Sequence, residues 1–199
     1  GGVAVVTGGA SGLGKAMAEE AARRGMKVVI ADVEAGAMEQ AVTDLRANGA
    51  EAIGVLTDVT SAASVEALAV TTEESFGPAN LLFNNAGVAS GGPIWESTEK
   101  DWKWLFGVNV DGVANGVRSF TPRMLAAAAA DAAYQGCIVN TASMAGLVTA
   151  PGMGIYSVSK HAVLALSECL YHDLDLIGRQ VRAAVLCPFY VSTNISQCH

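Results

Sequence analysis

The sequence predicts an α/β fold, a doubly wound parallel sheet with helices on both faces. Along the 199 residues, short apolar runs alternate with longer segments in which apolar residues recur at helical spacing. This pattern is typical of parallel strands joined by helical crossovers. A glycine-rich segment, Thr7 to Gly14, follows the first apolar run and fits a turn from a strand into a helix. Because such crossovers are right-handed, we expect three layers and the strand order 3-2-1-4-5-6.

We interpret six short apolar runs as strands buried within the sheet. Each run is bounded by turn residues or by a segment of helical period. In chain order the predicted strands are Val3 to Thr7, Lys27 to Ala31, Ala52 to Leu56, Asn80 to Asn84, Cys137 to Thr141 and Val181 to Cys187.

The intervening segments carry apolar residues that would share one face of a helix. These residues are Leu13, Met17 and Ala21; Met38, Val42 and Leu45; Val65, Leu68 and Phe76; Val110, Val113 and Val117; and Val163, Leu166, Leu170 and Leu174. We expect the fourth helix to be long, to begin near Thr98 and to include the alanine run that ends at Ala130. The Gly87 to Pro93 stretch is predicted to form a loop.

Composition and charge narrow the class of protein. We expect residues 1–199 to form one domain, because a chain of this length commonly buries a single core. Hydrophobic residues make up 51% of the chain, but no apolar run reaches the roughly 18 residues of a membrane span. The formal net charge of -7 provides no basic surface for nucleic acid. The four cysteines lack a C-x-x-C pair, which favours reduced thiols in a cytoplasmic protein.

The glycine-rich segment has the features of a phosphate-binding turn. Gly8, Gly12 and Gly14 would let the backbone approach the pyrophosphate of a dinucleotide, and the following helix would offer its unsatisfied N–H groups. Asp32 ends the second strand, where a carboxylate can bind both ribose hydroxyls and repel a 2′-phosphate. Neither Ser11 nor Val33 supplies a positive charge, so NAD is favoured over NADP. The alternative for Asp32 is a helix N-cap or a solvated acid.

Three later segments complete the pattern, and two of them carry groups that could take part in moving a proton. Tyr156 and Lys160 stand one helical turn apart, so the ammonium would lower the pKa of the phenol towards neutrality. Ser143 follows the fifth strand, where its hydroxyl could bind a reacting oxygen. The third segment is Asn84 to Gly87. The alternatives are an ordinary tyrosine on an amphipathic helix and a serine that caps a turn.

Together these segments resemble the short-chain dehydrogenase/reductase family, and the resemblance covers Val3 to Thr193. It implies a Rossmann fold and hydride transfer between NAD(H) and a secondary alcohol or ketone. It also implies a catalytic tetrad of Asn109, Ser143, Tyr156 and Lys160. In that tetrad Asn109 would hold a water that connects Lys160 to solvent. A buried hydrogen bond between helices is the alternative role for Asn109.

The resemblance also implies which residues contact the cofactor and which assembly forms. Lys160 would hold the nicotinamide ribose, and the helices that carry Asn109 and Tyr156 would be buried in a homodimer or homotetramer. No metal is expected. The implied cofactor-binding residues are Gly8, Ser11, Gly12, Leu13, Gly14, Asp32, Val33, Asp58, Val59, Asn85, Ala86, Gly87, Thr141, Tyr156, Lys160, Pro188, Phe189, Val191 and Thr193.

Two features depart from the family pattern. Phe189 follows Pro188 where the family usually has glycine, and its ring would either pack against the sheet or form a wall of the substrate pocket. The chain also ends at His199, before the helical lid and the last strand that the resemblance implies, so we expect that part to be missing.

The residues expected to line the pocket are mostly apolar, which favours a hydrophobic substrate over a phosphorylated one. Two other functions are compatible with the motifs: a dinucleotide-binding sensor without turnover, and an epimerase or dehydratase that uses the nicotinamide transiently. The expected lining residues are Val88, Ala89, Met144, Ala145, Met153, Phe189 and Tyr190.

Overall fold

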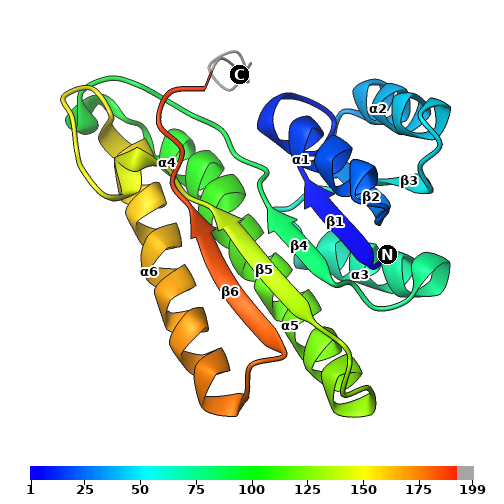
Figure 1. The fold of residues 1–199 in the computed structure, drawn as a ribbon. Helices are drawn as coiled ribbons and strands as arrows, with labels where there is room; N and C mark the ends of the chain where they lie inside the picture. The colour runs from blue at the N-terminus through cyan, green and yellow to red at the C-terminus, as the bar shows by residue number, and fades with distance from the viewer. Residues whose placement is uncertain (192–199) are drawn as a thin grey trace.

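A computed structural model describes residues 1–191 of the chain, and Figure 1 shows a parallel sheet flanked by helices. The sheet has six strands in the order β3-β2-β1-β4-β5-β6, which confirms the predicted order. Every neighbouring pair is parallel. The strands are β1 (Val3–Thr7), β2 (Lys27–Asp32), β3 (Ala52–Leu56), β4 (Leu81–Asn84), β5 (Gly136–Thr141) and β6 (Val181–Leu186).

The helices form two layers. One core packs α1 and α2 against β1 and β2, and another packs α3, α5 and α6 against the opposite face, as the two sides of the ribbon show (Figure 1). The helices are α1 (Gly12–Arg23), α2 (Ala35–Ala47), α3 (Ala62–Phe76), α4 (Glu99–Phe106), α5 (Gly112–Ala130) and α6 (Gly154–Ile177), with short helical turns η1 (Ile94–Glu96), η2 (Gly107–Asp111) and η3 (Met144–Gly146).

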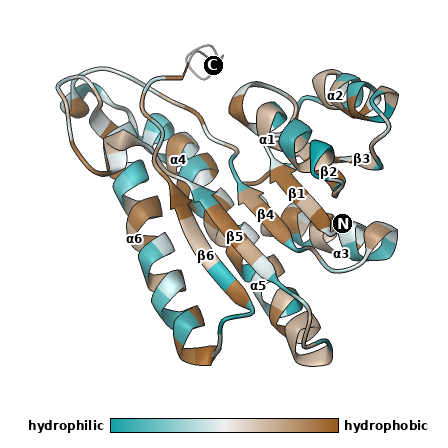
Figure 2. Ribbon diagram, in the orientation of Figure 1, coloured by the Kyte–Doolittle hydropathy of each residue, from teal (hydrophilic) through white to brown (hydrophobic). Residues whose placement is uncertain are grey.

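Burial of the central strands explains why their sequences are continuously apolar. All five residues of β1 are buried, because helices cover both of its faces. Figure 2 shows hydrophobic colour along β1 and β4, whereas α1, α2 and α6 alternate between hydrophilic and hydrophobic residues. The strand order reverses between β1 and β4. In doubly wound sheets, ligands bind outside the carboxyl ends of the strands at the point where the order reverses, so this edge of β1 and β4 is the expected ligand site.

The helix predicted from near Thr98 to Ala130 exists, but it contains an interruption that the sequence analysis missed. Thr98 is its N-cap and forms a capping box with Asp101, which satisfies otherwise unpaired N–H groups. Between α4 and α5 the backbone forms a π turn, η2. A π turn inserts an extra residue and commonly occurs at functional sites. Asn109 lies in this turn.

Within residues 1–191, no helix combines the length and the apolar character that crossing a membrane would require.

Close contact between α5 and β4 depends on Gly116. A Cβ atom at this position would overlap the side-chain oxygen of Asn84, whereas a Cβ at Gly36 on α2 would meet no atom within 4 Å. We therefore predict that Gly116→Ala lowers the free energy of unfolding by about 1–3 kcal/mol, a usual cost of overpacking. Gly36→Ala should leave stability unchanged or raise it slightly. Urea unfolding measures both, and equal stabilities would contradict this packing.

Candidate active site

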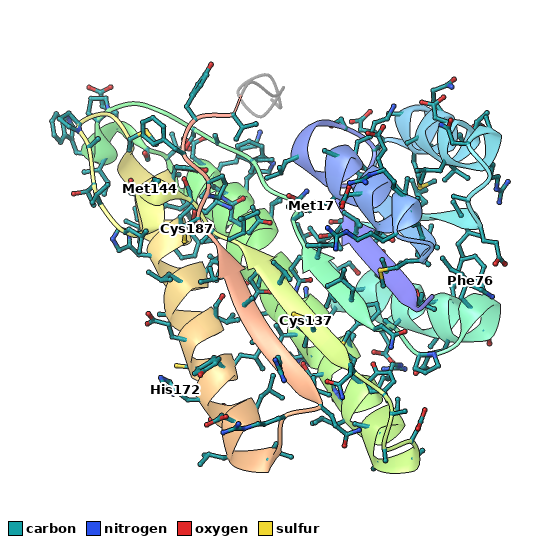
Figure 3. All side chains as sticks on the ribbon, in the orientation of Figure 1. Met17, Phe76, Cys137, Met144, His172 and Cys187 are labelled. Atoms are coloured by element: carbon teal, nitrogen blue, oxygen red, sulfur yellow. The ribbon has the colours of Figure 1, made fainter. Side chains whose placement is uncertain are left out.

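Most of the predicted site residues lie in segments near the carboxyl ends of the strands. Asn109 is the exception, because it lies in the turn η2. Thr193 lies outside the described residues. Figure 3 labels Met144 after β5 and Cys187 after β6, and these two segments lie side by side at this edge. The backbone N–H of Met144 donates to the carbonyl of Pro188 at 2.9 Å. The loops after β5 and β6 are thus joined at the carboxyl edge of the sheet.

The glycine-rich turn is packed too tightly for side chains. Gly8 and Gly12 have φ angles of +62° and +53°, in the left-handed region that favours glycine. A Cβ atom on Gly8 would lie 2.8 Å from Cα of Ala86, and one on Gly14 would overlap the carbonyl oxygen of Gly8. Glycine at these positions lets β1, α1 and the loop after β4 approach one another.

The first turn of α1 keeps its N–H groups free of side-chain capping. Ser11 is the N-cap residue and is exposed, but its side chain makes no capping hydrogen bond. The N–H groups at the start of a helix have no partner within the helix. Those of Gly12, Leu13 and Gly14 at the start of α1 therefore suit an anionic pyrophosphate. This geometry fits a dinucleotide.

Hydrogen bonds centred on Thr7 and Asn85 hold the loops around this turn. Thr7 Oγ1 accepts from the backbone N–H groups of Asn85 at 2.9 Å and Ala86 at 3.1 Å. Asn85 Nδ2 donates to the carbonyl of Thr7 at 3.1 Å, and Thr141 Oγ1 donates to Asn85 Oδ1 at 3.4 Å. These bonds connect the ends of β1, β4 and β5. Sequence reasoning missed this bracing role of Thr7.

Asp32 lies at the end of β2, as predicted, with a half-buried side chain. Its carboxylate accepts from the backbone N–H groups of Ala10 at 3.0 Å and Glu34 at 3.1 Å. The N-cap of α2 is Glu34, so Asp32 is not the cap of that helix. Val33 is exposed beside it. Asp32 thus fixes the glycine-rich turn while remaining accessible at the edge of the sheet.

Asp58 and Val59 follow β3 in a turn. Asp58 is exposed, and its carboxylate accepts from the backbone N–H of Thr60 at 2.9 Å and from the Thr60 hydroxyl at 2.8 Å. Val59 is buried, and its carbonyl accepts from Asn115 Nδ2 at 2.9 Å. The side-chain oxygens of Asp58 are thus partly used by its own turn.

Tyr156 and Lys160 lie in the first two turns of α6, and Ser143 lies at the start of η3, which packs against that helix. Ser143 caps η3, its hydroxyl accepting from the N–H of Ala145 at 3.1 Å, so the alternative role of a capping serine is observed. Burial raises the pKa of Tyr156, and a hydrogen bond with the same Ser143 hydroxyl opposes part of that rise. Lys160 Nζ lies 5.7 Å from the centre of the Tyr156 ring.

The expected lowering of the Tyr156 pKa by Lys160 was wrong for the chain as it stands. Burial of the phenol raises its pKa above the ordinary value, and the Ser143 hydroxyl opposes this rise only in part. Lys160 Nζ donates to the carbonyl of Thr141 at 3.0 Å. The ammonium thus faces a carbonyl and the face of the tyrosine ring, and burial of the phenol sets the direction of its pKa shift.

Lys160 is a buried cation, with 3% of its surface exposed. Burial lowers the pKa of its ammonium to about 8. A Cβ on Gly87 would lie 3.5 Å from Lys160 Nζ, which is an ordinary contact distance, and 3.3 Å from Asn109 Oδ1, which is a tight one. Lys160, Asn109 and Gly87 are therefore close neighbours.

The Asn109 side chain is fully buried and held by protein groups. Its Oδ1 accepts from the N–H of Val88 at 2.9 Å, and its Nδ2 donates to the carbonyl of Val88 and to Ser159 Oγ, each at 3.0 Å. This is the alternative that the sequence left open, a buried hydrogen bond between helices. The water relay stays a prediction. The sequence analysis did not identify Ser159. The one sequence feature that could have indicated it is a short polar side chain next to Lys160.

The segment after β6 carries two aromatic side chains that are exposed to solvent. Phe189 and Tyr190 are 82% and 86% exposed. The interpretation in which Phe189 packs against the sheet is therefore wrong for the described chain. Pro188 is half-buried, and Val191 is exposed.

A doubly wound sheet with a glycine-rich first turn, an acid at the end of the second strand and a paired tyrosine and lysine defines an α/β protein of the dinucleotide-binding type. Residues 2–198 match the family model described as short chain dehydrogenase. The chain belongs to the short-chain dehydrogenase/reductase family, whose members are oxidoreductases.

Named relatives support this assignment. The chain is 37% identical to a CLA biosynthesis dehydrogenase/reductase of Lactiplantibacillus plantarum, over 97% of this chain and 66% of that protein. It is 40% identical to the 1-deoxy-11-beta-hydroxypentalenate dehydrogenase of Streptomyces arenae, over 96% and 67%. A short chain dehydrogenase/reductase from Burkholderia phymatum, solved in complex with NAD, matches with 55% identity and a TM-score of 0.94, over 98% and 68%. The chain thus spans about two thirds of the length of these proteins.

The buried Lys160 makes a testable contribution to stability. Its pKa falls from 10.5 to about 8 on folding, so between these values the unfolded chain binds a proton that the folded chain has lost. The free energy of unfolding should therefore gain from Lys160 as the pH rises above about 8. Below that value both states are protonated, and this gain is absent.

We predict that replacing Lys160 by Met removes the gain. Urea unfolding at pH 7.5 and 9.5 should show that the stability difference, wild type minus Lys160→Met, grows with pH. A difference that stays constant or shrinks over this range would contradict the lowered pKa.

Proposed function

We propose that this protein is an NAD(H)-dependent oxidoreductase that interconverts an apolar secondary alcohol and its ketone. The observation that carries this proposal is the gathering of Tyr156, Ser143 and Lys160 in a chain whose glycine-rich turn follows β1 of the same sheet. A phenol, a hydroxyl and an ammonium in one place suit proton transfer to or from a substrate oxygen.

Each side chain has a distinct role. The Tyr156 phenol exchanges a proton with the substrate oxygen, and the Ser143 hydroxyl orients that oxygen. Bound NAD+ would accept the hydride that leaves the alcohol carbon. The raised pKa of Tyr156 keeps the phenol protonated at neutral pH, which suits a proton donor for ketone reduction; alcohol oxidation requires the phenolate.

The residues of the turn fit NAD better than NADP. The uncapped N–H groups of α1 suit the pyrophosphate, and the Asp32 carboxylate would repel a 2′-phosphate. The nearby cation Lys15 pairs with Asp44 at 2.9 Å, so its charge is already compensated. The Burkholderia phymatum relative was solved with NAD, which supports the same choice for this chain.

An apolar substrate is supported by the surroundings of Tyr156. Leu105 and Ile155 form a buried cluster with Tyr156. Four of the expected pocket residues pack against this cluster: Val88, Ala89, Ala145 and Met153. The protein named 1-deoxy-11-beta-hydroxypentalenate dehydrogenase supports an alcohol as the substrate class.

The proposed assembly is a homodimer or homotetramer in the cytoplasm. The outward surface of α6 carries Val158, Tyr171, Leu176 and Ile177, all exposed apolar side chains. Burial of such a surface between copies would remove apolar area from water.

Removal of the Tyr156 hydroxyl tests the proposed reaction. We predict that Tyr156→Phe lowers NADH formation from a panel of apolar secondary alcohols by at least about 10²-fold, the usual contribution of an acid or base. NAD affinity, measured by calorimetry, should stay within a few-fold of wild type. Turnover retained by Tyr156→Phe would remove Tyr156 from the mechanism. NADH formation by the wild type would also exclude a sensor without turnover.

The choice of cofactor depends on Asp32. We predict that Asp32→Ala shifts the NAD to NADP ratio of kcat/KM by about tenfold or more towards NADP, because loss of a nearby like charge relieves repulsion of the 2′-phosphate. Glu34→Ala is the matched control, since it removes an exposed carboxylate two positions away and should leave the ratio nearly unchanged. Equal ratios in both variants would exclude the ribose role of Asp32.

A further inference from the structure

The Ser159 hydroxyl forms hydrogen bonds that the tetrad does not include. Ser159 lies on α6 between Tyr156 and Lys160 and is 0% exposed. Its Oγ accepts from Asn109 Nδ2 at 3.0 Å and donates to the carbonyl of Tyr156 at 2.8 Å. We propose that Ser159 is a positioning residue that fixes the Asn109 amide and, through it, the Val88 loop beside the reacting groups.

The directions of these hydrogen bonds follow from the groups themselves. The N–H of Val88 can only donate, so it must meet Asn109 Oδ1, and the carbonyl of Val88 can only accept, so it must meet Nδ2. The second Nδ2 hydrogen then points to Ser159 Oγ. The Ser159 proton goes to the Tyr156 carbonyl. The amide therefore has one orientation that satisfies all its partners.

Complete burial makes the Ser159 contact consequential. Asn109 and Ser159 are each 0% exposed, so water cannot replace the acceptor if the hydroxyl is removed. A buried donor without an acceptor is costly, and the surrounding structure shifts to relieve it. Asn109 lies in a π turn, a feature that is frequent at functional sites.

The Val88 loop connects this network to the reaction. Val88 packs against the cluster that contains Tyr156, and its neighbour Gly87 lies beside both Lys160 Nζ and Asn109 Oδ1. A displacement of this loop changes the wall next to the phenol and the ammonium. This role rests on the proposed function, in which the Tyr156 phenol exchanges the proton beside the Lys160 ammonium.

The chain contains a matched control for Ser159. Ser167 also lies on α6 and is 2% exposed. Its Oγ accepts from Asn140 Nδ2 at 3.0 Å and donates to the carbonyl of Val163 at 2.7 Å. Ser159→Ala and Ser167→Ala thus each remove one bond accepted from an asparagine amide and one bond donated to a carbonyl of α6. Only the Ser159 substitution affects Asn109.

The first measurement does not require activity. Hydrogen exchange of the Val88 amide is followed by NMR in both variants of the full chain, with the Ile138 amide of β5 as the reference for global stability. Ser159→Ala should speed exchange at Val88 at least about tenfold relative to Ser167→Ala. Equal exchange rates at Val88 in the two variants would overturn the proposal. If Ser159→Ala does not fold, Ser159→Cys, which keeps the volume but accepts weakly, replaces it.

The second measurement links the contact to turnover. Ser159→Ala should lower kcat for alcohol oxidation about tenfold while KM for NAD changes less than twofold, and Ser167→Ala should keep kcat within twofold of wild type. Equal losses of kcat in both variants would mean that Ser159 acts only through stability. A wild type without turnover would refute the proposed function, and the exchange of Val88 would still decide the positioning role.

Discussion

Burial of the Lys160 ammonium is the constraint on which the arrangement of the site depends. A buried charge is unfavourable without hydrogen-bond partners, and within residues 1–191 the hydrogen bond found for Nζ goes to the carbonyl of Thr141. That bond ties α6 to the end of β5. An ammonium carries three donors, so it retains capacity for further acceptors. Burial lowers the pKa of the ammonium to about 8, because the hydrogen bond to Thr141 replaces only part of the hydration that the charge loses.

The surrounding residues make this burial possible. Gly87 lies next to the ammonium, and the hydrogen bonds of Thr7 and Asn85 hold the loop that contains Gly87 against β1. Gly8 and Gly14 allow the glycine-rich turn to pack against the same loop. The groups proposed for proton transfer and the expected dinucleotide site therefore contact one shared segment, the loop after β4.

The sequence predicts the sheet well because the information is local. Each strand is a short apolar run, and the order follows from right-handed crossovers, so all six strands were located to within a residue or two. The motif residues lie near the strand ends for the same reason. The sequence did not predict the π turn or the contacts of Asn109 within it. The hydrogen-bond partners of Asn109 are Val88 and Ser159, which are 21 and 50 positions away in sequence. The direction of the Tyr156 pKa shift depends on burial, and the exposure of Phe189 depends on the path of the chain after β6. Spacing alone reveals neither.

The central claim is that Lys160 and Tyr156 together form the site of hydride and proton transfer. A crystal structure of the protein with NAD+ and a bound secondary alcohol tests it most directly. The account predicts Lys160 Nζ within hydrogen-bonding distance of the nicotinamide ribose, and the Tyr156 and Ser143 oxygens both within such distance of the alcohol oxygen. A nicotinamide ring bound away from α6, or an alcohol oxygen that contacts neither hydroxyl, would contradict the account.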